Sequence, residues 1–168
     1  MKKAILVIIA FILCLMVVGC QDHDQKEIDQ VYIYHSGFGQ ITPEYKIDLK
    51  NKALWAYKSD LMENYQERNR ESENEGFTFV CNLESEKIED FIEKSIRNGF
   101  TKWHGFYDNP NICDGHQWGI EITYADQTAT EISGSNRYPN TWNKMRKAFE
   151  ELTGEDILIF DSNWLKEE

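Results

Sequence analysis

Two histidines and one cysteine lie within thirteen residues of one another: His104, Cys113 and His116. Imidazole nitrogen and thiolate sulfur are donors that zinc prefers, and Cys113-Asp-Gly-His116 places two of them three positions apart. A structural zinc site usually shows two such close pairs, and the sequence here shows one. These three residues are candidate metal ligands, but the pattern is incomplete, so we expect a protein without a cofactor.

A second candidate site runs from an expected strand into an expected helix, in Gly134-Ser-Asn-Arg-Tyr-Pro139. Unpaired backbone N–H groups at a helix N-terminus favour anions and polar acceptors, and an arginine adds a bidentate donor. With aromatic surface nearby, the segment could hold a carboxylate, a phosphate or a sugar. The alternative is a turn that packs against the start of the helix. The candidate ligand residues are Asn136, Arg137, Tyr138, Trp142 and Trp103.

Carboxylates are abundant, with 29 Asp and Glu residues in 168. Glycoside hydrolysis needs two carboxylates at a defined separation. In so acidic a chain some pair meets any distance, so abundance alone is no evidence. Glu121, on the polar face of an expected strand, is the least arbitrary candidate. It leaves a cell-envelope hydrolase, using carboxylates or a metal, as an alternative to a binding protein.

The first twenty residues have the organisation of an export signal. Lys2 and Lys3 precede an uninterrupted apolar run, Ala4–Val18. This run is at the long end for a signal peptide and short for a membrane span, which takes roughly 20 apolar residues.

The apolar run closes with Val17-Val18-Gly19-Cys20, which resembles the lipobox of bacterial lipoproteins. The resemblance implies that residues 1–19 are a signal peptide and that Cys20 carries a thioether-linked diacylglycerol. It also implies a protein anchored by lipid to the extracytoplasmic face of the cell membrane. We expect residues 20–30 to form a flexible tether and residues 31–168 a single globular domain.

The remaining cysteines are Cys81 and Cys113, because Cys14 lies in the signal and Cys20 would be lipidated. Two thiols in an exported protein can pair, and this bridge would contribute about 3 to 4 kcal/mol in the chain-entropy model. The alternative is a small buried side chain at Cys81 and a loop thiol at Cys113. The sequence leaves both open.

The charge balance limits the partners. The first twenty residues hold two of the 18 basic residues and none of the 29 acidic ones, so the mature part carries 16 basic and 29 acidic side chains, a net charge of −13. This argues against nucleic-acid binding, which needs a basic surface, and against adhesion to anionic membranes by charge. It favours basic partners.

Hydrophobic periodicity predicts short strands and two amphipathic helices. One helix follows Ser85, with apolar residues at Ile88, Phe91, Ile92 and Ile96, and stops at Asn98-Gly99; the other starts near Pro139 and stops at Gly154. Residues 100–107 could form a short strand or a connector, and 157–160 an edge strand or a packed tail. Strands are predicted at 31–35, 45–49, 53–57, 77–83, 118–124 and 128–133.

Aromatic residues in these strands are interpreted as core. In the hairpin of residues 45–57 we expect five side chains on one face, and in the strand at 77–83 four on one face. These are Tyr45, Ile47, Leu49, Trp55 and Tyr57 in the hairpin, and Phe77, Phe79, Cys81 and Leu83 in the strand. Trp164 is the tryptophan we expect to be exposed.

The order of the elements does not alternate strand and helix, so a doubly wound parallel sheet is not expected. We predict an α+β fold, an antiparallel sheet built from hairpins with two helices packed on one face. The leading functional hypothesis is a membrane-tethered binding or interaction module for a protein or a small polar ligand. A third hypothesis is an accessory or inhibitor lipoprotein that acts on a secreted protein.

Overall fold

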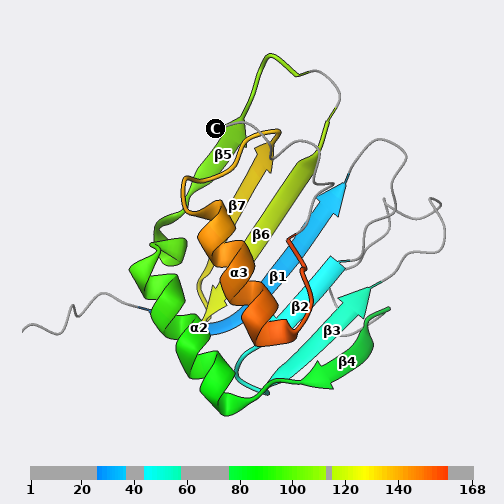
Figure 1. Ribbon diagram of the computed structural model, residues 1–168, viewed down its shortest axis with the longest axis vertical. Coiled ribbons are helices and arrows are strands. Elements are labelled where there is room, and N and C mark those ends of the chain that lie inside the picture. Colours follow the sequence, from blue (N-terminus) through cyan, green and yellow to red (C-terminus); the bar gives the residue numbers. More distant parts are fainter. Residues whose placement is uncertain (1–25, 37–43, 58–75, 113–114, 159–168) are drawn as a thin grey trace, which may run out of the picture.

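The computed structural model describes residues 26–36, 44–57, 76–112 and 115–158. Within these ranges the chain forms seven strands, two α-helices and one 3-10 helix (Figure 1). In chain order they are β1 (Ile28–Ser36), β2 (Glu44–Asp48), β3 (Ala53–Tyr57), β4 (Thr78–Asn82), α2 (Ser85–Arg97), η2 (Phe100–Lys102), β5 (Gly105–Asp108), β6 (Gln117–Tyr124), β7 (Ala129–Ser135) and α3 (Trp142–Thr153).

The strands form one sheet in the order β4-β3-β2-β1-β6-β7-β5. All neighbours are antiparallel except β5 and β7, which are parallel. The predicted α+β fold with an antiparallel sheet is confirmed. β1 begins at Ile28, whose side chain is buried, so the strand starts before the boundary at residue 31 expected from the sequence.

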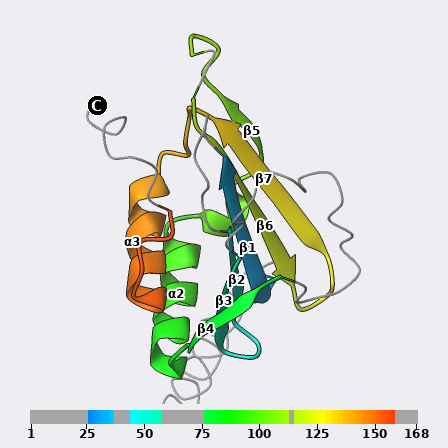
Figure 2. The same ribbon diagram turned by 90° about the vertical axis from the view of Figure 1, so that its right-hand side faces the viewer.

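Helices α2 and α3 pack on one side of the sheet, as Figure 2 shows, and this confirms the predicted layers. We call the covered side of the sheet the inner face and the opposite side the outer face. The two helices meet each other through Phe91 and Phe149, whose ring centroids lie 4.8 Å apart. Phe100, from η2, packs edge-on against both rings. Burial of such large apolar rings supplies most of the stabilisation of a two-layer domain.

Helix α2 begins at Ser85 itself, with Glu84 at the N-cap position, and not after Ser85 as predicted; its apolar stripe also differs in one position. Ile88 and Phe91 are buried, but Ile96 is exposed and Ser95 is buried in its place. At about 100° per residue, position i+7 from Ile88 lies closer to the centre of the stripe than position i+8. The helix ends as predicted, with Gly99 in the left-handed conformation (φ 67°).

Helix α3 begins at Trp142, after a turn, rather than at Pro139 or Asn140. Its predicted apolar stripe is confirmed, since Trp142, Met145, Phe149 and Leu152 are all buried. After the helix, Ile157 and Leu158 are buried in a non-strand segment, which favours the packed tail over an edge strand within the described residues.

The face assignment of β3 from the sequence is wrong. Ile47 of β2 pairs with Leu54, so Leu54 and Ala56 share the inner face with Ile47. Trp55 and Tyr57 therefore lie on the outer face, since side chains alternate along a strand. The sequence suggested the opposite assignment, because large aromatic side chains are expected on the buried face of a strand.

The face assignment of β4 is wrong for a different reason. Cys81 pairs with Leu54 but Phe79 pairs with Trp55, so Val80 is one extra residue in β4. Such a β-bulge breaks the alternation of faces. Cys81 packs against the core while Phe79, 47% exposed, stands beside Trp55 on the outer face.

No helix in the four described ranges is long and apolar enough to cross a membrane.

Candidate functional site

The outer face carries a row of aromatic side chains in ring contact. The ring centroids of Tyr34 and Tyr32 lie 5.7 Å apart, those of Tyr32 and Phe77 6.2 Å, and those of Phe77 and Tyr57 5.7 Å. Polar groups accompany them: the Tyr32 hydroxyl donates to the carboxylate of Glu44. Aromatic residues with a hydroxyl or indole N–H suit a surface that is apolar on one side and wet on the other.

Tyr34 is held in place by a glycine and a carboxylate. Its phenol ring lies over Gly119 of β6, where an added Cβ would come within 2.0 to 2.4 Å of the ring atoms. Its hydroxyl donates to Glu131 over 3.3 Å. The bare backbone at Gly119 therefore lets the ring lie flat on the sheet instead of standing out from it.

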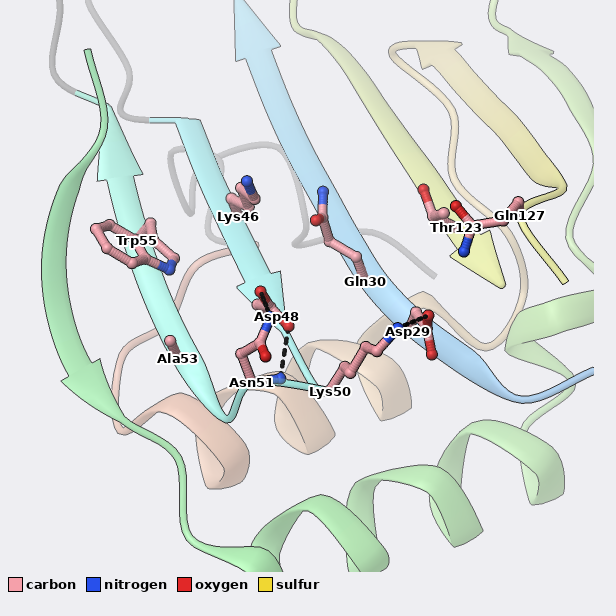
Figure 3. Close-up of a pocket in the computed structure, with 10 residues that line it drawn as sticks. All are labelled: Asp29, Gln30, Lys46, Asp48, Lys50, Asn51, Ala53, Trp55, Thr123 and Gln127. Atoms are coloured by element: carbon pink, nitrogen blue, oxygen red, sulfur yellow. Dashed lines mark hydrogen bonds and ion pairs between the residues drawn. The ribbon is translucent and has the colours of Figure 1, made fainter. Parts of the chain in front are cut away.

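Beside the aromatic row, the outer face has a pocket of about 460 Å³. Figure 3 shows side chains that line it, drawn from β1, β2, β3 and β6 and the turns that follow β2 and β6. This volume falls within the range typical of small-molecule sites. The lining residues are Asp29, Gln30, Lys46, Asp48, Lys50, Asn51, Ala53, Trp55, Thr123 and Gln127.

The strand register sets three polar side chains of the pocket in a line. Gln30 of β1 is paired with Asp48 of β2 on one side and with Thr123 of β6 on the other. Neighbouring strands are roughly 4.8 Å apart. A carboxylate, an amide and a hydroxyl therefore lie side by side, in this order, across β2, β1 and β6.

Trp55 forms the apolar end of the pocket. It pairs with Lys46 across β2 and β3 and is partly exposed. Phe79 packs against the indole in an edge contact, with centroids 5.4 Å apart and planes at 76°. Ala53, two positions before Trp55 on the same strand face, is too small to fill the space beside the ring.

The charges in the pocket balance, with two aspartates and two lysines among the lining residues. Lys50 pairs with Asp29 at 3.5 Å. Asn51 donates to the two carboxylate oxygens of Asp48, through its backbone N–H at 2.8 Å and its side-chain amide at 2.9 Å. These contacts fix the carboxylate before any ligand arrives, which reduces the entropy lost on binding.

The structure places the sequence-predicted ligand residues in two environments. Trp103 and Trp142 are 5% and 3% exposed and stack with centroids 5.6 Å apart, so these rings belong to the core and give no aromatic surface. Trp103 also donates its indole N–H to the Thr141 hydroxyl at 3.1 Å. Burial leaves no ring face of either tryptophan for a ligand.

The remaining three residues form the connection between β7 and α3. The Asn136 side-chain oxygen accepts the His116 backbone N–H at 2.8 Å, and the Arg137 carbonyl accepts the Trp118 indole N–H at 2.9 Å. Burial raises the pKa of Tyr138 to about 12. The segment thus has the packing contacts of a structural turn, and the Arg137 side chain is exposed. Ligand binding by Arg137 stays a prediction.

The predicted metal ligands are divided by the limits of the described chain. His104 is exposed, with Nδ1 2.9 Å from the Lys102 carbonyl oxygen, and Cys113 lies outside the described residues. His116 is half-buried beside His35, with ring centroids 5.9 Å apart. Among the residues that the structure describes, no group of three His, Cys, Asp or Glu could hold a metal ion.

His35 is a buried titratable group on the inner face. It ends β1, opposite Trp118 of β6. Burial, together with the nearby His116, lowers the pKa of His35 to about 4. Burial also lowers the pKa of His116. Both rings are therefore neutral at physiological pH.

Cys81 is a free cysteine in β4, at one edge of the sheet. Its predicted partner Cys113 lies outside the described residues, as do Cys20 and Trp164. Gly115, close to Cys113 in the chain, leads into β6 and contacts Asn136, several strands away from β4.

Glu121 lies on the outer face, directly opposite Glu131 of β7. Cβ atoms of such a cross-strand pair are about 5 Å apart. Glu131 also accepts the Tyr34 hydroxyl, which ties this carboxylate to the aromatic row.

Comparisons with protein-family models, curated proteins and solved structures found no match.

The sequence did not single out the pocket, because its residues come from segments that only the strand register brings together. The sequence pattern favours a core position for Trp55 and places Gln30 in the expected tether. The one signal that could have found it is the alternation Lys46, Asp48 in β2 beside Trp55 in β3, once the hairpin register is known.

Proposed function

We propose that this protein is a lipid-anchored binding module of the bacterial cell envelope and that the outer face of its sheet is the ligand surface. One observation carries the proposal. The described helices both lie on the inner face, while the outer face has a polar pocket next to a partly exposed tryptophan (Figures 2 and 3). Concave sites with a few convergent polar groups and aromatic walls are the usual form of ligand sites.

The anchor is supported by the N-terminal sequence. The lipobox-like Val17-Val18-Gly19-Cys20 follows a basic start and an apolar run, and β1 begins eight residues after Cys20. A single short tether of this kind would keep the domain near the membrane surface. The ligand would accordingly be a component of the envelope or of the extracytoplasmic space.

The anchor is tested by cell fractionation with metabolic lipid labelling. Cys20→Ala should carry no lipid label and should no longer give the processed, membrane-bound form, because the thioether needs the thiol. Cys14→Ala is the matched control, since this cysteine lies inside the expected signal, and it should behave as wild type. Absence of label in the wild type, with unchanged membrane association of Cys20→Ala, would end the lipoprotein proposal.

The ligand surface is tested by hydroxyl-radical footprinting of the purified full-length protein with and without an isolated cell-envelope fraction. Phe79 and Phe106 form a matched pair, because both are exposed on the outer face, 47% and 65%, but Phe79 packs against Trp55 of the pocket while Phe106 lies in the opposite edge strand. The proposal predicts protection of Phe79 and Trp55 with Phe106 unchanged. Protection confined to Arg137 and its neighbours would place the site instead at the β7–α3 connection.

A further inference from the structure

We propose that the outer-face pocket binds a saccharide, through one or two pyranose rings of an uncharged oligosaccharide. This inference rests on the proposed function, since it assumes that the outer face is the ligand surface. Three features of the pocket support it: the presentation of Trp55, the line of polar groups beside it, and the balance of charge.

The indole of Trp55 provides a flat apolar surface of the size of a sugar ring. A pyranose has C–H groups on its faces and hydroxyl groups around its edge, so it can stack on an aromatic ring while its rim remains polar. Phe79 contacts the indole at 5.4 Å and restricts its rotation. A ring already held in one orientation loses little side-chain entropy when a ligand stacks on it.

The polar side chains of Asp48, Gln30 and Thr123 can form hydrogen bonds with the hydroxyl groups around the edge of a pyranose. Asp48 accepts hydrogen bonds only, while the Gln30 amide and the Thr123 hydroxyl can both donate and accept. The three side chains come from adjacent strands, roughly 4.8 Å apart, which is comparable to the width of a pyranose. A ligand that matches both donors and acceptors at this spacing is one with several hydroxyl groups.

The balance of charge argues against an ionic ligand. The pocket has two aspartates and two lysines within a mature chain whose net charge is −13. A site for a cation in such a chain would be expected to retain a surplus of acids, and a site for an anion a surplus of bases. Here Asp29 is already paired with Lys50, which leaves Asp48 and Lys46 as one acid and one base among the lining residues.

The size of the pocket sets the expected affinity. About 460 Å³ accommodates one or two sugar rings. With one stacking ring and a few exchangeable hydrogen bonds, we expect a Kd of about 0.1 to 1 mM.

The test is a titration of the purified full-length protein, in detergent micelles, with four uncharged tetrasaccharides. These are built from glucose, mannose, galactose and N-acetylglucosamine, and binding is followed by calorimetry and by ligand-observed NMR. At least one of them should bind. Trp55→Ala should weaken it about tenfold, since aromatic stacking contributes about 1 kcal/mol or more. Gln30→Ala should weaken it several-fold.

Phe106→Ala is the matched control, because it removes an exposed aromatic side chain from β5, at the edge of the sheet away from the pocket. It should leave the Kd within twofold of wild type. If Trp55→Ala does not fold, Trp55→Phe and Gln30→Ala keep the test decisive, because a smaller ring and a lost amide should each still weaken binding.

The inference is overturned if none of the four saccharides binds at millimolar concentration, or if Trp55→Ala binds as wild type. Footprinting then separates this failure from that of the proposed function. Protection of Phe79 by the envelope fraction that disappears after protease treatment would mean a protein ligand on the same face. No protection by any envelope preparation would remove both proposals.

Discussion

Aromatic side chains line both faces of the sheet, but their surroundings differ. On the inner face Trp118 and Phe149 are almost completely buried and contact other rings on several sides. On the outer face the hydroxyl groups of Tyr32 and Tyr34 donate hydrogen bonds to carboxylates, and Trp55 borders a polar pocket. The first set stabilises the fold through dry packing. The second set keeps polar partners, as the ligand surface that we propose requires.

On each face an aromatic ring also covers a glycine within a strand. Gly134 of β7 lies under the Trp118 indole on the inner face, and Gly119 of β6 lies under the Tyr34 phenol on the outer face. The two positions offer the same chemical change in the two environments.

Loss of a ring from the inner face should give the largest effect. Phe149→Ala removes a completely buried side chain that contacts Phe91 and Phe100. We expect the free energy of unfolding to fall by about 3 to 5 kcal/mol, measured by urea denaturation. Phe106→Ala, from the exposed edge, should change it by less than about 0.5 kcal/mol. Equal losses in the two variants would contradict the contrast between packed and exposed aromatic residues.

The next largest difference is expected between alanine substitutions of the two covered glycines, Gly134 on the inner face and Gly119 on the outer face. In Gly134→Ala the new Cβ would lie about 2.6 Å from indole atoms of Trp118, which is fixed by its neighbours. We expect a loss of about 2 to 3 kcal/mol from overpacking. In Gly119→Ala the tip of the Tyr34 ring can swing toward solvent, so about 1 kcal/mol or less should be lost. The same denaturation series measures both, and a larger loss at Gly119 would show that the outer face is rigidly packed.

The inner face should also be sensitive to acid. The pKa of His35 is lowered from 6.5 to about 4, so the unfolded chain takes up the proton first as the pH falls. This contribution to stability is fully present above pH 6.5 and is lost progressively between pH 6.5 and about 4. By pH 5 the free energy of unfolding should drop by about 2 kcal/mol.

The control for this pH dependence is the exposed histidine His104. His104→Gln should retain the loss between pH 7 and pH 5, whereas His35→Gln should flatten it. An unchanged slope in His35→Gln would show that another group controls the acid sensitivity.

A smaller effect on stability than at Phe149 is expected at Trp55, beside the pocket. Trp55→Ala should lower the free energy of unfolding by about 1 to 2 kcal/mol, because the Trp55 side chain is only partly buried and less apolar area is recovered on folding than at Phe149. A thermal melt compared with wild type measures this. A loss comparable to that of Phe149→Ala would move Trp55 from the recognition surface to the core.

Much of the fold could be predicted from the sequence because its signals are local. The stop of α2 at Asn98-Gly99 and the stripe of α3 follow from caps and periodicity within one segment. The pocket could not be predicted in this way. It depends on which residue of β3 faces which residue of β2, and one residue of slip exchanges the two faces.

The bulge at Val80 illustrates the same limit. One extra residue in β4 sends Phe79 to the outer face and Cys81 to the inner face, although alternation places them together. Trp103 and Trp142 show the converse error: both were predicted to offer a surface near Arg137, and stacking on each other places them in the core. Residue type alone did not distinguish a buried side chain from one on the outer face in either case.

The central claim, that the outer face is the ligand surface, is tested most directly by NMR mapping of a bound oligosaccharide on the isotopically labelled protein. We expect shifts at the Trp55 indole N–H and at the backbone amides of Gln30, Lys46 and Thr123, with the signals of α2 and α3 unchanged. Shifts confined to Arg137, Tyr138 and the start of α3, with the Trp55 signal unchanged, would contradict a ligand surface on the outer face.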